Sequence, residues 1–394
     1  MIIKPKVRGF ICTNAHPTGC EANVQEQIKH IQSKTYSSAK KPKNVLVIGC
    51  STGYGLASRI TAAFGYGAST LGVCFEKAPS DKLGSAGYYN TAAFQALARK
   101  AGLKAETLNG DAFSQEMKTL VIDHLKKDFG PVDLVVYSLA SPRRVDPVSG
   151  ETFQSVLKPV GKAITSKNLN TDTRKIGEIT IEPANADEIA HTVKVMGGED
   201  WELWIDALHQ AGVLAEGVET VAYTYLGDKL TWPIYGQATI GKAKEDLDRA
   251  SRAIAQKLSG LKGNAHVAVL KALVTQASSA IPLMSLYLSI LIRVMKAAGT
   301  NEHCIEQIDR LFSECIYSDQ PRLDDQNRFR VDELELDPSI QREVERIWDQ
   351  VTDDNLDDLT DFAAYQADFL KLFGFGIKSV DYDQEVGPEA ASDF

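Results

Sequence analysis

The stretch that decides the fold is residues 44–55, which read NVLVIGCSTGYG. It is apolar from Val45 to Ile48 and then becomes a glycine turn with the spacing G-x-x-x-G-x-G. Apolar residues follow at every fourth position, as on one face of a helix: Leu56, Ile60 and Phe64. A buried strand, a tight turn and a helix in this order are the parts of a dinucleotide-binding unit.

Each glycine of the turn has its own physical reason. Gly49 lets the chain turn sharply, Gly53 leaves room for a pyrophosphate, and Gly55 lets the helix approach the strand. The helix N-terminus then offers free N–H groups and a positive dipole end to the phosphates. The alternative is a glycine-rich turn without a ligand, but the flanking strand and helix favour the nucleotide site.

The rest of the chain repeats the strand-helix alternation. Further strands are predicted at 70–75, 104–108 and 132–139, with helices at 91–100 and 115–127 between them. This order predicts an α/β protein with a Rossmann-type, doubly wound parallel sheet. Residues 1–12 are expected to form a short strand or a hairpin. Further helices are expected at 21–32 and 200–210, one ending at about 258, and one at 278–296, with strands at 218–226 and 265–271.

Two regions depart from the alternation. From about 141 to 199 we expect an insertion, which begins with a stretch rich in Pro, Gly, Thr and Lys that forms loops or short strands. The last part, 318–394, is acidic and helical, and its charge run at 353–361 reads as a solvated face. We therefore expect one dinucleotide-binding domain over 1–317, with 318–394 packed on it.

Composition excludes several classes of function. The chain has 394 residues and a net charge of −9, which argues against a nucleic-acid partner. Its six cysteines include no C-x-x-C pair and its seven histidines no metal-ligand pattern, so we expect reduced thiols, no metal and a cytoplasmic protein. No signal peptide is visible. The apolar run 281–292 is shorter than the ~20 residues of a membrane span and predicts a buried helix or one lining an apolar pocket.

Three strand ends carry candidate cofactor contacts. Glu76 is placed to accept hydrogen bonds from ribose hydroxyls and to repel a 2′-phosphate, which favours NADH, although Lys77 weakens that inference. Asp111 is placed to accept from an adenine amino group, with a helix N-cap as the alternative. Leu139 and Ala140 end the fourth strand, where backbone passes under the ribose and nicotinamide, unless they simply end a strand.

Tyr235 and Lys244 are the candidate catalytic pair. In short-chain dehydrogenases such a pair is four residues apart, whereas here the spacing is nine. Nine residues of regular helix turn about 900° and would put the side chains on opposite faces, so the chain must bend between them. Gly236 and Gly241 lie in that interval. The alternative is a snorkelling lysine and an unrelated tyrosine.

Other side chains are open to two interpretations. Tyr223 and Tyr225 share a strand face and either pack in the core or line a substrate pocket. We expect Trp201 and Trp204 to pack in the core. Arg143 and Arg144 either meet carrier phosphates or are ordinary surface residues.

Long runs of the chain resemble the trans-2-enoyl-CoA reductases and the FabV-type enoyl-acyl carrier protein reductases. The resemblance covers nearly the whole chain and includes RGFICTNAHPTGCEANV, GCSTGYG, YSLASPRR, VKVMGGEDW, LAEGVETVAYTYLG, LVTQASSAIP and LTDFAAY. It implies a short-chain-dehydrogenase-like Rossmann fold with extra N-terminal, inserted and C-terminal segments, and a monomer.

The resemblance also implies the site. Tyr235 is the implied proton donor, Lys244 holds the nicotinamide ribose, and Tyr225 contacts substrate. The implied NADH contacts are Gly49, Cys50, Ser51, Thr52, Gly53 and Tyr54 at the pyrophosphate, Phe75 and Glu76 at the ribose, Asp111 and Ala112 at the adenine, Leu139 and Ala140 at the centre, and Leu273, Val274 and Thr275 at the carboxamide.

The implied activity is an NADH-dependent oxidoreductase that reduces the C2=C3 bond of trans-2-enoyl thioesters, the last step of the fatty acid elongation cycle. The carrier, acyl carrier protein or coenzyme A, stays open, as do the acyl chain length and a flavin. Two other readings remain: a carbonyl-reducing short-chain dehydrogenase and a non-catalytic NADH-binding protein.

Overall fold

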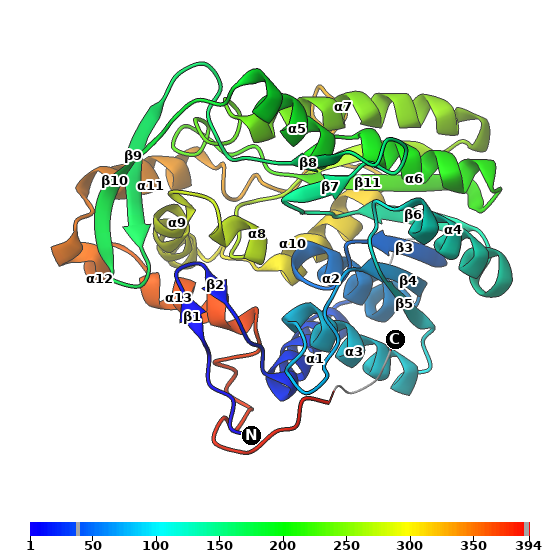
Figure 1. Cartoon of the computed structure of the whole chain (residues 1–394), viewed down its shortest axis with the longest axis horizontal. Helices are drawn as coiled ribbons and strands as arrows, with labels where there is room; N and C mark the ends of the chain where they lie inside the picture. The colour runs from blue at the N-terminus through cyan, green and yellow to red at the C-terminus, as the bar shows by residue number, and fades with distance from the viewer. Residues whose placement is uncertain (37–39, 390–393) are drawn as a thin grey trace.

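A parallel sheet forms the centre of the computed structural model, which describes residues 1–36, 40–389 and 394 (Figure 1). Its strand order is β13-β12-β11-β6-β3-β4-β5, and every pair is parallel. The strands are β3 (Asn44–Ile48), β4 (Ser69–Cys74), β5 (Ala105–Asn109), β6 (Val132–Tyr137), β11 (Leu214–Thr224), β12 (Asn264–Val269) and β13 (Phe329–Arg330). The predicted doubly wound sheet is confirmed, and the glycine turn directly follows β3, an interior strand between β6 and β4.

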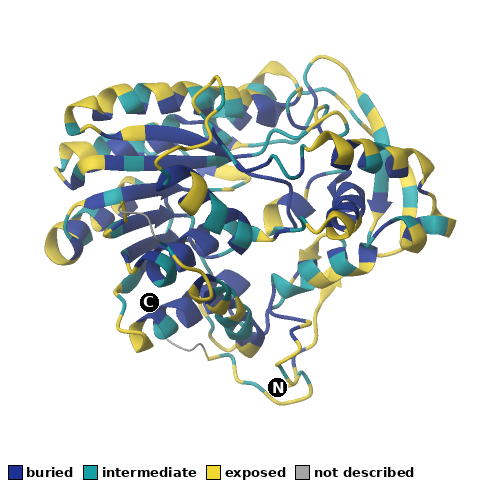
Figure 2. Ribbon diagram, turned by 180° about the vertical axis from the view of Figure 1, so that it is seen from behind, coloured by how far each residue is buried: buried dark blue, intermediate teal, exposed yellow. Residues whose placement is uncertain are grey.

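Helices cover both faces of the sheet, because alternate strand residues point to opposite sides. Val45 and Val47 of β3 pack among α1 (Pro17–Gln32), α2 (Gly53–Ile60), α3 (Ala86–Lys100) and α10 (Cys304–Arg310). Leu46 and Ile48 face α4 (Gln115–His124), α6 (Glu199–Gln210) and α7 (Thr239–Leu258). Strands β3, β4, β6 and β12 are accordingly buried over almost their whole length (Figure 2).

The two tryptophans of α6 pack in the core, as expected. Trp201 and Trp204 are fully buried. Each indole N–H has a partner: Trp201 donates to Thr220 Oγ1 at 2.9 Å and Trp204 to Ala112 O at 3.1 Å. Both side chains belong to the core between α6 and the sheet.

Helix starts differ from the prediction where a cap lies upstream of the apolar pattern. α1 begins at Pro17, not 21, because His16 Nδ1 accepts from Gly19 N–H and proline suits the first turn. α3 begins at Ala86, not 91, although Ser85 before it makes no side-chain cap. Three helices continue into π-helical turns, namely α2 by Thr61–Gly65, α4 by Leu125–Phe129 and α10 by Leu311–Ile316.

The expected insertion contains two antiparallel hairpins. These are β7 (Arg143–Val145) with β8 (Thr152–Gln154) and β9 (Ile164–Asn170) with β10 (Lys175–Ile181), followed by α5 (Ala186–Met196). The N-terminal hairpin, β1 (Val7–Arg8) with β2 (Ile11–Cys12), is confirmed. The C-terminal helices are α11 (Pro338–Gln350), α12 (Leu356–Leu359) and α13 (Phe362–Lys371). The domain boundary at 317/318 stays a prediction; β13 lies beyond it and pairs with β12.

The apolar region predicted as one helix over 278–296 is two helices. α8 (Gln276–Ser279) and α9 (Met284–Ala298) are separated at Pro282, which lacks an N–H, and at Leu283, whose φ of +63° interrupts the helix. α9 is buried under α11 and α13. In the described part of the chain, no helix has both the length and the apolar character needed to cross a membrane.

Candidate active site

The glycine turn after β3 has the geometry of a phosphate site. A Cβ on Gly49 would lie 2.3 Å from Ser138 O, and one on Gly55 would lie 1.8 Å from Gly49 O, so strand, turn and helix meet as closely as predicted. Above Gly53 the space is open, with only the Thr275 methyl 3.8 Å from its Cβ position. Thr52 makes no side-chain cap on α2, which leaves the helix N–H groups free for a ligand. These residues fit a pyrophosphate.

Glu76 is a firmly held carboxylate at the end of β4. Ser51 and Ser85 donate hydroxyl hydrogen bonds to its Oε1 and Oε2 at 2.6 and 2.5 Å. Asn109 pairs with its backbone in both directions, at 2.8 and 2.9 Å. Gly87 leaves the room that the carboxylate fills, since a Cβ there would lie 2.1 Å from Glu76 Oε1. Glu76 is therefore tied to the glycine turn through Ser51 and is not a free surface residue.

The neighbouring strand ends complete this edge. The Asp111 carboxylate accepts from Phe113 N–H at 2.9 Å, while Ser114 caps α4, so the alternative that Asp111 is the helix cap is wrong. Phe75 is 78% exposed. The Leu139 side chain lies 3.2 Å from the Cβ position of Gly49. The turn, Glu76 and Leu139 thus lie along one edge of the sheet, where ligands of such sheets bind.

Tyr235 and Lys244 are on opposite sides of a bend, as predicted. Tyr235 lies in turns, and α7 begins only at Thr239. A Cβ on Gly241 would lie 2.5 Å from Tyr235 O and 2.3 Å from Gly236 O. Glycine at 241 therefore lets the turn that carries Tyr235 pack against the first turn of the helix that carries Lys244.

Both candidate residues, Tyr235 and Lys244, contact the chain at the C-terminal end of β11. The Tyr235 ring packs edge-on against Tyr225, with centroids 4.6 Å apart, and Lys244 Nζ donates a long hydrogen bond of 3.5 Å to Tyr223 O. Burial lowers the pKa of Lys244 to about 8. Burial, with the charge of Glu335, raises the pKa of Tyr235 and keeps its hydroxyl protonated.

The two tyrosine hydroxyls differ in their partners. Tyr225 donates to Glu335 Oε1 at 2.8 Å and lies 3.2 Å from Thr231 Oγ1. No described residue forms a hydrogen bond with the Tyr235 hydroxyl, which leaves it available to a ligand. Tyr223 shares a 2.6 Å hydrogen bond with the Ser58 hydroxyl and is a packing residue.

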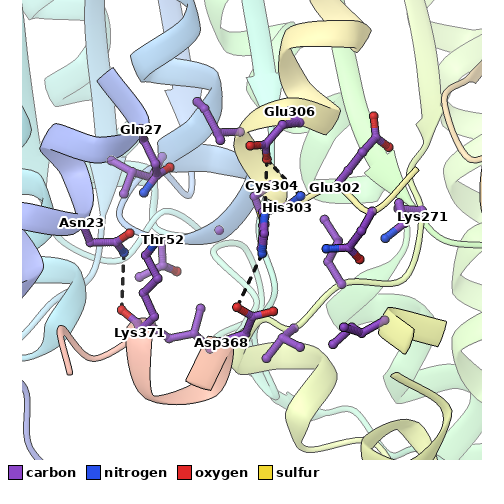
Figure 3. Close-up of a pocket in the computed structure, with 18 of the residues that line it drawn as sticks. Asn23, Gln27, Thr52, Lys271, Glu302, His303, Cys304, Glu306, Asp368 and Lys371 are labelled. Atoms are coloured by element: carbon purple, nitrogen blue, oxygen red, sulfur yellow. Dashed lines mark hydrogen bonds and ion pairs between the residues drawn. The ribbon is translucent and has the colours of Figure 1, made fainter. Parts of the chain in front are cut away.

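A cavity of about 320 Å³ lies beside the glycine turn (Figure 3). Its walls include Thr52 and Gly53, the buried Lys271, residues 272–274 and the apolar side of α9. At its edge His303, the residue before α10, lies between Glu306 of α10 and Asp368 of α13. Hydrogen bonds to these two carboxylates raise the pKa of His303 to about 9. Sequence reasoning missed Lys271 and His303, because neither belongs to a periodic pattern or a spaced motif.

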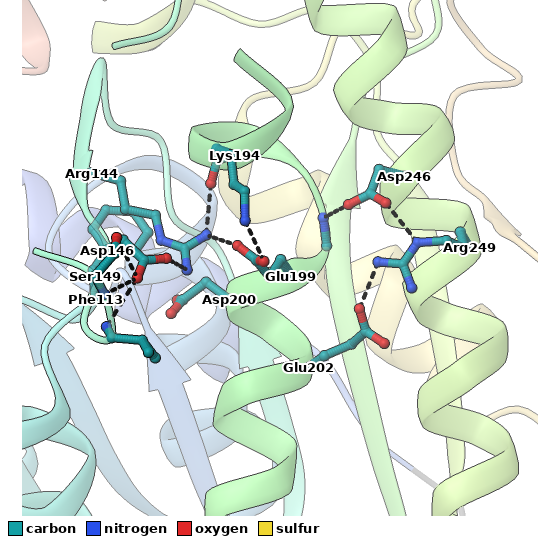
Figure 4. A network of polar contacts seen from close by, with 12 residues as sticks. Phe113, Arg144, Asp146, Ser149, Lys194, Glu199, Asp200, Glu202, Asp246 and Arg249 are labelled. Carbon is teal, nitrogen blue, oxygen red and sulfur yellow. Dashed lines mark hydrogen bonds and ion pairs between the residues drawn. The ribbon is translucent and has the colours of Figure 1, made fainter. Parts of the chain in front are cut away.

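Arg144 is a structural residue, so its expected alternatives, carrier phosphate or open surface, are both wrong (Figure 4). It is 1% exposed, and its Nη1 donates to Lys194 O at 2.7 Å and to Glu199 Oε2 at 2.9 Å. It therefore joins the β7–β8 hairpin to α5 and α6. Arg143 is exposed, and its phosphate role stays a prediction. Among the described residues no three His, Cys, Asp or Glu side chains gather as a metal ion requires.

Three family models match consecutive parts of the chain. They are the NAD(P)H binding domain of trans-2-enoyl-CoA reductase over residues 2–81, the trans-2-enoyl-CoA reductase catalytic region over 82–317 and the enoyl reductase FAD binding domain over 323–386. The last segment gives two charged side chains to the cavity, Asp368 and Lys371, which are paired with His303 and Glu26.

Full-length relatives carry related names. The chain is 66% identical to the enoyl-[acyl-carrier-protein] reductase [NADH] of Saccharophagus degradans, covering 100% of both chains, and 65% identical to that of Teredinibacter turnerae, covering 99% of each. Among solved structures it is similar to the trans-2-enoyl-CoA reductase of Treponema denticola in complex with NAD, at 48% identity, TM-score 0.96 and 100% coverage of both chains. The enzyme of Clostridium acetobutulicum in complex with NADH matches at 40% identity and TM-score 0.95, with 98% of each chain covered.

Proposed function

The chain belongs to the trans-2-enoyl-CoA reductase family, and on this premise we propose that it uses NADH to reduce the C2=C3 bond of trans-2-enoyl thioesters. The observation that carries the proposal is the Tyr235 hydroxyl. It has no hydrogen-bond partner among the described residues, it lies beside Tyr225, and it is carried on a turn packed against the helix of Lys244. A free phenol beside a dinucleotide site suits the protonation of an enolate.

The cofactor contacts follow the edge of the sheet. The turn from Gly49 to Tyr54 binds the pyrophosphate, and Glu76, held by Ser51 and Ser85, accepts from the adenosine ribose hydroxyls. The exposed Phe75 ring gains cover from the adenosine. Asp111 with Ala112, Leu139 with Ala140, and Leu273 to Thr275 are the remaining proposed contacts. NADH, when bound, supplies the hydride for C3 of the thioester.

Tyr235 and Lys244 have separate roles in the mechanism. As negative charge develops on the thioester oxygen, the Tyr235 hydroxyl donates a hydrogen bond to it and then a proton to the enolate. The high pKa of Tyr235 keeps the proton in place until then. Lys244, whose pKa is about 8, is mostly a cation at neutral pH and binds the nicotinamide ribose. Tyr225 orients the substrate beside Tyr235.

Acyl carrier protein is the proposed carrier, because the relatives at 65–66% identity are named for it. A carrier of that kind is acidic, so docking to a chain of net charge −9 needs a local basic patch. We also propose that the enzyme acts as a monomer in the cytoplasm, in fatty acid synthesis.

The test is NADH oxidation with crotonyl-CoA and crotonyl-acyl carrier protein side by side, with NADPH and a ketone substrate as comparisons. We expect turnover of both thioesters with NADH and a higher kcat/KM for the carrier-protein thioester. Reduction of the ketone alone would select a carbonyl-reducing dehydrogenase. NADH binding without turnover of either thioester would select a non-catalytic binding protein.

A further inference from the structure

Glu335 is a fully buried carboxylate in the turn between β13 and α11. Three donors surround it. The hydroxyls of Tyr225 and Tyr287 donate to its Oε1 at 2.8 and 2.7 Å, and the Ala272 backbone N–H donates to its Oε2 at 2.6 Å. A buried charge persists only where it is paired and hydrogen-bonded. The three donors meet that requirement for the Glu335 carboxylate.

The three donors belong to three different parts of the candidate active site. Tyr225 is the proposed substrate contact and packs on Tyr235. Ala272 directly precedes Leu273–Thr275, the segment that faces the glycine turn. Tyr287 is on α9, whose apolar side lines the cavity. One carboxylate from the C-terminal segment therefore joins the substrate tyrosine, the cofactor segment and α9.

We propose that Glu335 is the positioning residue of this reductase: it orients Tyr225 toward the substrate and anchors the segment that begins at Ala272. The proposal rests on the function proposed above. Because the Tyr225 hydroxyl donates its hydrogen bond to Glu335, Tyr225 does not serve as a second proton donor, and Tyr235 alone protonates the enolate. Tyr225 then acts through its ring and its oxygen lone pair.

The groups around Glu335 oppose the effect of burial on its pKa. Burial raises its pKa, while the buried ammonium of Lys271, the Ala272 N–H and the two tyrosine hydroxyls oppose that rise and favour the carboxylate. The ionised form suits three donors, because it has only acceptors to offer. Lys271 itself donates to Ala272 O at 3.2 Å, so both sides of residue 272 are held, one by each charge.

Glu335→Gln is the sharpest variant, because it keeps the shape and removes the charge. Its amide oxygen still accepts from Ala272 N–H, while its NH₂ faces two hydroxyls that formerly donated to this position. We expect NADH affinity, measured by fluorescence titration, to change less than about twofold. The KM of the enoyl thioester should rise about tenfold, the scale for losing a hydrogen bond to a charged group. The matched control is Glu385→Gln, an exposed glutamate of the same segment, with unchanged constants.

A double-variant cycle distinguishes positioning from general loss of stability. Tyr225→Phe alone should raise the thioester KM by a similar factor, and adding Glu335→Gln to it should raise the KM little further, since both changes break one interaction. Additive effects, or wild-type KM in Glu335→Gln, overturn the proposal. If Glu335→Gln does not fold, Tyr225→Phe decides: a wild-type KM there overturns it as well. Wild-type protein that reduces no enoyl thioester refutes the proposed function instead.

Discussion

Replacing Tyr235 by phenylalanine removes one oxygen atom and little else. The ring is 8% exposed and packs edge-on against Tyr225, a contact that phenylalanine retains. Among the described residues no hydrogen bond to the hydroxyl is lost, so the folded protein leaves no buried partner unsatisfied. We therefore expect the melting temperature and the affinity for NADH to stay close to those of the wild type.

The rate should respond very differently. If the hydroxyl is both the hydrogen-bond donor to the developing oxyanion and the general acid, its loss lowers kcat by about 10²–10³-fold, or about 2.7–4 kcal/mol of transition-state stabilisation. Steady-state NADH oxidation with an enoyl thioester measures this loss, and a fluorescence titration measures NADH binding in the same sample. A selective fall in kcat assigns the hydroxyl to the chemical step.

Tyr225→Phe is the matched control for Tyr235→Phe, because it also removes one tyrosine hydroxyl. Tyr225 directly follows β11. The substitution removes a hydroxyl that already donates to Glu335, so it should raise the thioester KM and lower the melting temperature, with kcat within a few fold of the wild type. Near-normal turnover in Tyr235→Phe, or a larger loss of kcat in Tyr225→Phe, would refute the assignment and make Tyr225 the proton donor.

Three further outcomes test the cofactor side and the C-terminal segment. Glu76→Ala removes the carboxylate that repels a 2′-phosphate and frees Ser51 to bind one, so the NADPH/NADH ratio of kcat/KM should rise about tenfold, or about 1.4 kcal/mol, whereas an unchanged ratio assigns the preference elsewhere. Lys244→Met should weaken NADH binding as well as turnover. Because the pKa of Lys244 is about 8, wild-type kcat/KM should fall as the pH rises through 8. In Lys244→Arg, which stays charged, this fall in kcat/KM should disappear. If the fall persists in Lys244→Arg, it belongs to another group. The pKa of His303 is raised from 6.5 to about 9, so its contribution to stability is complete below pH 6.5 and is lost as the pH rises through 9; His303→Gln should lower the melting temperature at pH 6 and not at pH 10, with an effect of about 1 kcal/mol or less because the side chain is half exposed.

The parallel sheet and the glycine turn at its edge could be predicted from the sequence because their signals are local. The apolar strand, the glycine spacing and the apolar face of the next helix all lie within residues 44–64, and each has one physical meaning. The bend between Tyr235 and Lys244 was readable for the same reason, since nine residues of helix cannot bring both side chains to one face. Helix starts were less readable, because caps such as His16 lie outside the apolar pattern.

The contacts that hold the candidate site residues could not be predicted from the sequence, because they join residues far apart along the chain. Tyr225 and Glu335 are separated by 110 positions, and nothing in the periodicity around Glu335 distinguishes it from the other acids of the acidic C-terminal segment. Arg144 was expected to meet a phosphate or to be an ordinary surface residue. In the folded chain it is buried against Glu199. Burial decides both cases, and burial of a charge depends on partners that only the folded chain supplies. Since the carboxylate that accepts from Tyr225 comes from beyond residue 317, the surroundings of Tyr225 and Tyr235 are complete only with the C-terminal segment in place.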